Sequence, residues 1–180
     1  MNIKPFIGSL MAALVLAVAA GARAAEPAAT PAASDLAAYE QLKSLAGLWS
    51  GRVADDSGLD VQVRYEVKSN GKAVIEYLFP DTPHEMVTVY YLASGRLLAT
   101  HYCSIGNQPA YRPAAGSAPT DIRMEFAGGT GFDPQADQHA HGVEIRSKDA
   151  GHIEVEWHFQ KGLQPSGSKR MILARAPVAG

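Results

Sequence analysis

Residues 84–109 read HEMVTVYYLASGRLLATHYCSIGNQP, two apolar runs that flank the tight turn Ala93-Ser94-Gly95. Apolar runs on either side of a short glycine-containing turn are typical of a β-hairpin. His84 and Glu85 open the first run, whereas His101 and Cys103 close the second, so antiparallel pairing would bring these polar residues together at one end of the hairpin. The stretch therefore predicts both a hairpin and the place of a site.

The first 24 residues have the features of an export signal. Lys4 precedes an apolar run over residues 6–20, and Ala22-Arg23-Ala24 forms a small-x-small cleavage site. The run is short for a membrane span, no second candidate follows it, and no cysteine for a lipid anchor lies near the cleavage site. We expect a signal peptide over residues 1–24, no membrane span, and a periplasmic or secreted protein.

The charge and the cysteine content exclude several classes of protein. Without Lys4 and Arg23, 14 basic residues stand against 18 acidic ones, and no basic patch points to nucleic acid. Cys103 is the only cysteine, so an exported chain would have no internal disulfide and would depend on its core. The simplest interpretation of Cys103 itself is a buried small apolar residue.

The rest of the chain predicts one β-domain. An Ala/Pro-rich tether over residues 25–34 precedes a short helix capped by Ser34 or Asp35, and the domain would cover residues 35–176, with a tail over 177–180. Alternating apolar residues then indicate about nine hairpin-connected strands: 49–54, 61–67, 73–79, 86–92, 97–102, 122–127, 141–145, 153–159 and 170–175. This pattern predicts an all-β, up-and-down antiparallel barrel of about 8–10 strands, with a β-sandwich as the alternative.

Two features of this pattern concern the inside of the barrel and its loops. Residues 104–120 and 128–140 are longer than ordinary hairpin connections, and loops of this length often form functional rims. The alternation places a set of apolar side chains in the interior: Val63, Tyr65, Ile75, Tyr77, Phe126, Val155 and Trp157. On the strand 73–79, this assigns Ala73, Ile75, Tyr77 and Phe79 to the buried face.

Several motifs resemble known families. Gly47-Leu48-Trp49, after a short helix and at the start of the first strand, resembles the G-x-W signature of the lipocalin-like (calycin) barrels. The resemblance implies an arginine on the last strand that covers the tryptophan, and either Arg170 or Arg175 could take that place. LAGLWSG, HEM, HYC and GNQP together resemble a group of secreted bacterial proteins with a lipocalin-like domain of unknown function. That likeness implies a fold and no activity.

The candidate site lies at one mouth of the predicted barrel. His101 and Cys103 share a face with Leu97 and Ala99, whereas the phase of the strand 86–92 leaves open whether His84 or Glu85 joins them. Asn107 and Gln108 could bind a ligand carbonyl or amide, and Arg112 could meet an anionic head group. The predicted ligand-binding residues are His84, Glu85, His101, Cys103, Asn107, Gln108, Arg112 and His141, with Tyr65 and Tyr77 from the interior.

We therefore expect a monomer or weak homodimer that binds a small, largely apolar molecule and carries no catalytic residues or cofactor. One alternative is a transition-metal or haem site formed by His101, Cys103, His139 and His141, because imidazole and thiolate are common metal ligands. A second is a hydrolase of small esters or lactones, in which Cys103 and His101 would act. A third is a filled barrel that binds partners through its loops.

Overall fold

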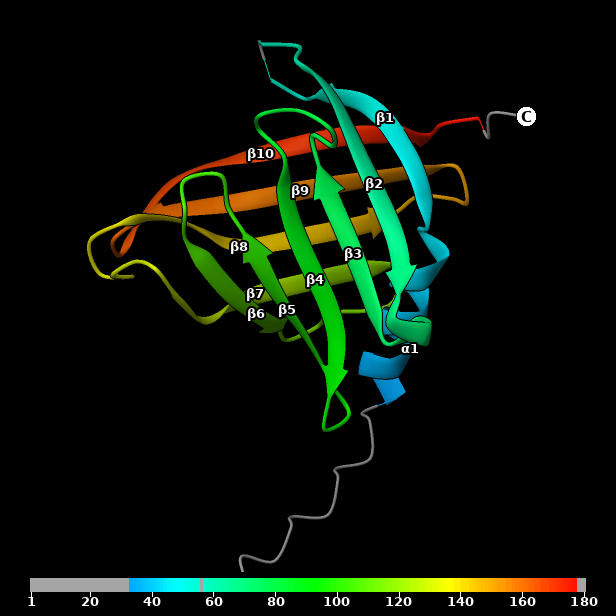
Figure 1. Cartoon of the computed structure of the whole chain (residues 1–180), viewed down its shortest axis with the longest axis horizontal. Coiled ribbons are helices and arrows are strands. Elements are labelled where there is room, and N and C mark those ends of the chain that lie inside the picture. Colours follow the sequence, from blue (N-terminus) through cyan, green and yellow to red (C-terminus); the bar gives the residue numbers. More distant parts are fainter. Residues whose placement is uncertain (1–32, 56, 178–180) are drawn as a thin grey trace, which may run out of the picture.

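The computed structural model describes residues 33–55 and 57–177. In these residues, ten antiparallel strands follow one another around a closed barrel, and β1 pairs with both β2 and β10 (Figure 1). The up-and-down barrel with one short helix is confirmed, and the sandwich alternative is wrong. None of the described helices is long and apolar enough to cross a membrane. The predicted signal peptide lies outside the described residues, as do residues 25–32 and 178–180.

The elements, in chain order, are α1 Ala33–Ser44, β1 Gly47–Val53, β2 Asp60–Lys68, the 3-10 turn η1 Ser69–Gly71, β3 Ala73–Leu78, β4 Met86–Ala93, β5 Arg96–Tyr102, β6 Gln108–Pro113, β7 Asp121–Thr130, β8 Gln138–Ser147, β9 His152–Lys161 and β10 Gln164–Arg175. β6 lies inside the stretch 104–120, which was predicted to be one long loop. β7 and β8 likewise extend into the predicted loop 128–140. The connections at these places are therefore shorter than expected.

The hairpin of β4 and β5 is confirmed. Ala93 pairs with Arg96, so Ser94 and Gly95 alone form the turn, and their φ angles are 47° and 78°. Positive φ at both central residues is the geometry that matches the twist of two antiparallel strands. The hairpin therefore sets the register that turns Leu97, Ala99 and His101 toward the interior, where all three are buried.

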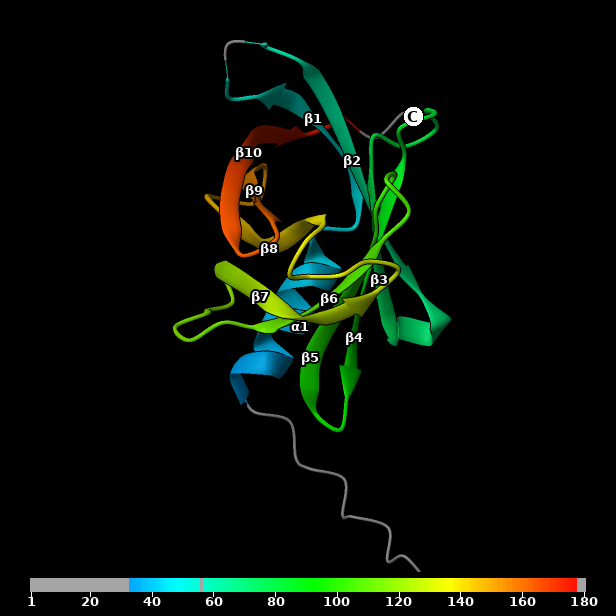
Figure 2. The same cartoon turned by 90° about the vertical axis from the view of Figure 1, so that its left-hand side faces the viewer.

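Helix α1 closes one end of the barrel (Figure 2). Tyr39, Leu42 and Leu45 are buried beneath the strands, and the Tyr39 hydroxyl donates to the Gly71 carbonyl at 3.2 Å. The helix begins at Ala33, so Ser34 belongs to the helix rather than to the predicted tether. Asp35 lies in its first turn rather than at its cap, and the carboxylate reaches the β4–β5 turn, where it accepts hydrogen bonds from the Leu97 amide at 3.1 Å and Arg96 Nε at 2.9 Å.

Trp49 and Arg175 also help to close this end of the barrel, at the point where the chain passes from α1 into β1. The indole Nε1 of Trp49 donates to the Leu45 carbonyl at 2.8 Å, and the guanidinium carbon of Arg175 lies 4.3 Å from the centroid of the Trp49 ring. Arg175 also donates to the carbonyls of Ala46 at 2.7 Å and Ser44 at 2.9 Å, the free backbone acceptors at the end of α1. Of the two candidate arginines, Arg175 therefore covers the tryptophan.

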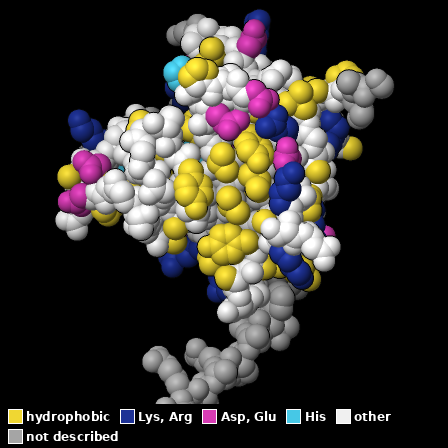
Figure 3. All heavy atoms as spheres, viewed as in Figure 1, with side chains coloured by type: hydrophobic (Ala, Val, Ile, Leu, Met, Phe, Trp, Pro, Cys, Tyr) yellow, Lys and Arg dark blue, Asp and Glu magenta, His cyan; other side chains and the backbone are white. Residues whose placement is uncertain are grey.

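The predicted face of β3 is wrong by one residue. Val74, Glu76 and Leu78 are buried, whereas Ala73, Ile75 and Tyr77 lie on the outer face and are half-buried. The outer face of the sheet is itself apolar here, because Ile75 pairs with Val89 and Tyr77 with Val87. Figure 3 shows hydrophobic side chains gathered on this side of the molecule. Of the predicted interior residues, Val63, Tyr65, Val155 and Trp157 are buried and Phe126 is half-buried.

Candidate functional site

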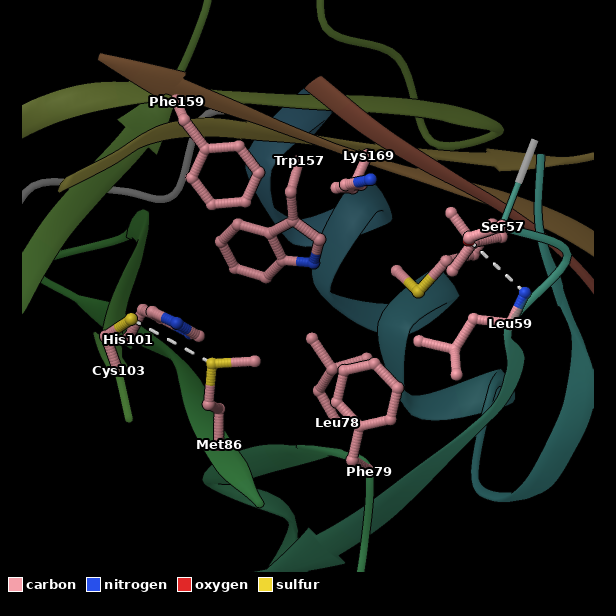
Figure 4. A pocket seen from close by; sticks show the side chains of 12 residues that line it. Ser57, Leu59, Leu78, Phe79, Met86, His101, Cys103, Trp157, Phe159 and Lys169 are labelled. Carbon is pink, nitrogen blue, oxygen red and sulfur yellow. Dashed lines mark hydrogen bonds between the residues drawn. The ribbon is translucent and has the colours of Figure 1, made fainter. Parts of the chain in front are cut away.

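A cavity of about 240 Å³ opens at the end of the barrel opposite α1, here called the mouth (Figure 4). The ends of β3, β5 and β9, the start of β4 and the β1–β2 connection all contribute to its wall. Most of the lining is apolar: Val53, Leu59, Leu78, Phe79, Met86, Phe159 and Met171. Five further lining residues carry polar or reactive groups: Ser57, His101, Cys103, Trp157 and Lys169. The sequence predicted two of these five, His101 and Cys103, as site residues.

His101 reaches the cavity from β5 and is only 2 % exposed. Thr88 lies opposite it on β4, and its hydroxyl forms a 3.0 Å hydrogen bond with His101 Nδ1. The imidazole also packs against Trp157, with the ring centroids 4.5 Å apart. Burial lowers the pKa of His101 from 6.5 to about 4, since the charged ring would lose its hydration. The side chain is therefore neutral at neutral pH.

Cys103 follows His101 by two residues, on the same face of the chain and nearer the mouth. Its Sγ is 3.9 Å from Sδ of Met86, and the residue is half-buried. A thiol nucleophile needs a base within hydrogen-bond reach. Among the hydrogen bonds of the described residues, Cys103 has none to His101, whose Nδ1 is bonded to Thr88. Both side chains thus line the cavity without a hydrogen bond between them.

Trp157 reaches the same cavity from β9 and is 2 % exposed. Its indole nitrogen lies on the cavity side of the ring in Figure 4, and Nε1 has no hydrogen-bond partner among the described residues. Sequence reasoning placed Trp157 in the interior but missed this polar atom. The apolar alternation that located the ring says nothing about what the N–H would face.

Among the described residues that line the cavity, Lys169 alone is a lysine or arginine, and its ammonium is paired. Lys169 of β10 forms an ion pair with Asp55 in the β1–β2 connection. Hydrogen bonds from Lys169 and Ser57 hold the pKa of Asp55 at about 2. The ammonium of Lys169 is thus already neutralised by a carboxylate at the surface.

Eight of the ten predicted binding residues do not line the cavity, and four of these eight lie on the outside of the barrel. His84 and Glu85 are exposed in the β3–β4 connection, where Glu85 accepts a 2.9 Å hydrogen bond from the Asp81 amide. Arg112 is exposed and pairs with Glu125 at 2.9 Å. Tyr77 lies on the outer face of β3, beneath the guanidinium of Arg64. The structure does not bring these side chains to His101.

Asn107 and Gln108 brace the loops instead of lining the cavity. Asn107 is buried, and its Nδ2 donates to the Gln138 carbonyl at 2.9 Å. Gln108 Nε2 donates to the Gly106 carbonyl at 2.9 Å, and its Oε1 accepts from Thr130 at 3.1 Å. These bonds hold the start of β6 against β7 and β8.

His139 and His141 form a second polar group, packed against Phe126. His139 Nδ1 lies 3.1 Å from the Asp137 carbonyl, which can only accept, so this nitrogen carries the proton. In neutral His139 the other nitrogen, Nε2, carries no proton and accepts from His141 Nδ1 at 3.1 Å. Burial, with a smaller effect of His139, lowers the pKa of His141.

The four predicted metal ligands are split between these two places. His101 and Cys103 line the cavity, whereas His139 and His141 lie in the aromatic group on β8. Across residues 33–55 and 57–177, no three His, Cys, Asp or Glu side chains gather as a metal site would require. The structure therefore brings together two pairs and not the four-residue set.

A buried carboxylate below the cavity was also missed. Glu76 of β3 is fully buried, and its Oε2 accepts a 2.6 Å hydrogen bond from the Tyr90 hydroxyl. Tyr65 is buried beside it. Burial raises the pKa of Glu76 from 4.5 to about 7, against the lowering effect of Tyr90. The only sequence signal is one acidic residue inside the apolar run Ala73–Leu78.

Comparison with known proteins gives no relative to add to this geometry. No family model matches the chain, and a search of curated proteins finds no significant match. The site must be interpreted from its own residues.

Proposed function

We propose that this chain is an exported, lipocalin-like barrel that binds a small, largely apolar molecule without catalysis. The observation that carries the proposal is the cavity of about 240 Å³ at the mouth, lined mainly by apolar side chains. Concave, mostly apolar cavities with a few polar groups are the usual form of small-molecule sites. The interior of a closed barrel has room for one such ligand.

Sequence and packing support the remaining parts of the proposal. Lys4, the apolar run 6–20 and Ala22-Arg23-Ala24 support export. The contact of Arg175 with Trp49 agrees with the arrangement that the G-x-W resemblance implies for lipocalin-like barrels. The bonding of His101 to Thr88 rather than to Cys103 favours binding over hydrolysis.

The test is binding of N-phenyl-1-naphthylamine to the purified mature protein. This uncharged dye fluoresces in apolar sites, so its fluorescence measures how much of it is bound. Met86→Trp places a large ring at the mouth and should abolish dye binding, since Met86 lines the cavity. Val87→Trp is the matched control, because Val87 is the next residue of β4 and lies on the outer face. A wild-type protein that binds no dye, or equal loss in both variants, would overturn the proposal.

A further inference from the structure

We propose that the cavity selects uncharged ligands that carry one hydrogen-bond acceptor, such as a ketone or ester carbonyl, and that the acceptor binds Trp157 Nε1. This inference rests on the proposed function, because it requires a ligand in the cavity. It adds the chemical class of that ligand and the side chain that recognises it.

The first argument is the unpartnered N–H of Trp157. The indole ring is 2 % exposed, and Nε1 finds no acceptor among the described residues. Buried polar groups in folded proteins nearly always have a hydrogen-bond partner, and a donor without one costs free energy. Among the residues that line the cavity, Ser57 alone has a side-chain oxygen, and this oxygen is already bonded to Asp55 and to the Leu59 amide. A ligand acceptor that enters the cavity would fill this position.

The second argument is that the indole is held in place before a ligand arrives. The imidazole of His101 packs on the Trp157 ring, and Tyr111 meets it edge-on with the centroids 6.1 Å apart. His101 is fixed in turn by Thr88, and the Tyr111 hydroxyl donates to the Ala140 carbonyl at 3.0 Å. A donor whose orientation is already set loses little conformational freedom on binding.

The third argument concerns charge. A carboxylate that leaves water for an apolar cavity needs a cation beside it. Among the lining residues, Lys169 is paired with Asp55, and buried His101 is neutral at neutral pH. No unpaired positive charge is therefore available to an anionic head group among these lining side chains. An uncharged acceptor needs only the N–H that is present.

Three probes of similar shape test the inference: 2-acetonaphthone, 2-ethylnaphthalene and 2-naphthoate, each as a competitor of N-phenyl-1-naphthylamine at pH 7. The ketone should bind about tenfold more tightly than the ethyl compound, the effect of one hydrogen bond to a buried donor. The carboxylate should bind more weakly than either. In Trp157→Phe the ketone and the ethyl compound should bind with about equal affinity. Trp49→Phe, a change at the closed end, should keep the tenfold difference.

A spectroscopic measurement on the wild-type protein avoids dependence on the variant's folding. The Nε1–H proton of Trp157 should shift downfield in a ¹H–¹⁵N spectrum on addition of 2-acetonaphthone and not on addition of 2-ethylnaphthalene. The carbonyl stretch of the bound ketone should move to lower frequency. If the dye itself does not bind, the proposed function fails. If the dye binds and neither naphthalene compound displaces it, only the present inference fails. If both bind equally well, if naphthoate binds as tightly as the ketone, or if the Trp157 signal does not distinguish them, only the present inference fails.

Discussion

The hydroxyl of Tyr90 donates a 2.6 Å hydrogen bond to Oε2 of Glu76, and both residues are completely buried inside the barrel. The other carboxylate oxygen, Oε1, has no hydrogen-bond partner among the described residues. One donated bond does not replace the hydration of an ionised carboxylate. Glu76 is therefore held closer to its protonated form than an exposed glutamate, with a pKa of about 7.

This burial predicts a fold that weakens as the pH rises. The folded protein binds the Glu76 proton more tightly than the unfolded chain, whose carboxyl titrates near 4.5. The contribution to stability is thus complete below pH 4.5 and is lost toward pH 7, a change of about 3 kcal/mol. Glu76→Gln should remove this loss, so its free energy of unfolding should exceed that of the wild type more at pH 8 than at pH 5.

Urea denaturation across this pH range measures the effect. Glu125→Gln is the control, because Glu125 is an exposed carboxylate on the outer face of β7. Parallel stability curves for Glu76→Gln and the wild type would contradict the prediction.

The burial of His101 predicts that the free energy of unfolding falls as the pH is lowered, the opposite of the effect of Glu76. Its pKa is about 4 in the folded protein and near 6.5 in an unfolded chain, so the unfolded chain takes up the proton first. Stability should be complete above pH 6.5 and fall by about 3 kcal/mol as the pH drops to 4. His101→Gln should flatten this acid limb, and exposed His84→Gln should leave it unchanged. An acid limb of equal slope in His101→Gln would show that the imidazole does not cause the loss.

The cap on Trp49 predicts that the two C-terminal arginines differ in their effect on stability. Arg175→Lys loses the planar contact with the indole and the paired hydrogen bonds to Ser44 and Ala46. We expect a loss of about 1–2 kcal/mol in the free energy of unfolding. Arg170→Lys, on an exposed position of the same strand, should change stability by less than about 0.5 kcal/mol. Equal effects, measured by thermal or urea unfolding, would argue against a sealing role for Arg175.

The hydrogen bonds of Asp35 to the β4–β5 turn predict that this carboxylate stabilises the packing of α1 against the barrel. Asp35→Ala leaves the buried Leu97 amide without its acceptor and removes the pair with Arg96, at an expected cost of about 2 kcal/mol. Hydrogen exchange should quicken at Leu97 and along α1, and should stay unchanged in β8 and β9. Glu40→Ala is the control, since Glu40 is an exposed acid on the same helix. Unchanged exchange at Leu97 would mean that the carboxylate does not hold the helix.

The hairpin and the faces of most strands could be predicted because they depend on local pattern. Ser94 and Gly95 form the two-residue turn, and the alternation from Leu97 to His101 follows directly from it. β6 was missed because Pro109 and Pro113 lie within it, and proline normally argues against a strand. The face of β3 was misassigned because the apolar side chains of Ile75 and Tyr77 lie outside and Glu76 lies inside.

The polar part of the site could not be predicted in the same way. Whether Trp157 Nε1 has a partner depends on side chains of β3 and β10 that are distant in sequence. The separation of His101 from His139 likewise depends on the curvature of the barrel, which a strand pattern does not contain. Sequence therefore named two residues that line the cavity, His101 and Cys103, whereas its other polar groups needed the three-dimensional arrangement.

The position of α1 also determines how the barrel can be attached to a support. The helix begins at Ala33 beside the closed end, and β10 ends next to it, where Arg175 contacts Ser44. Both ends of the described chain thus leave from the closed end, whereas the cavity opens at the mouth. A surface, bead or fused domain joined at either end would face the helix, and the cavity would open outward, free to exchange its contents with the surroundings.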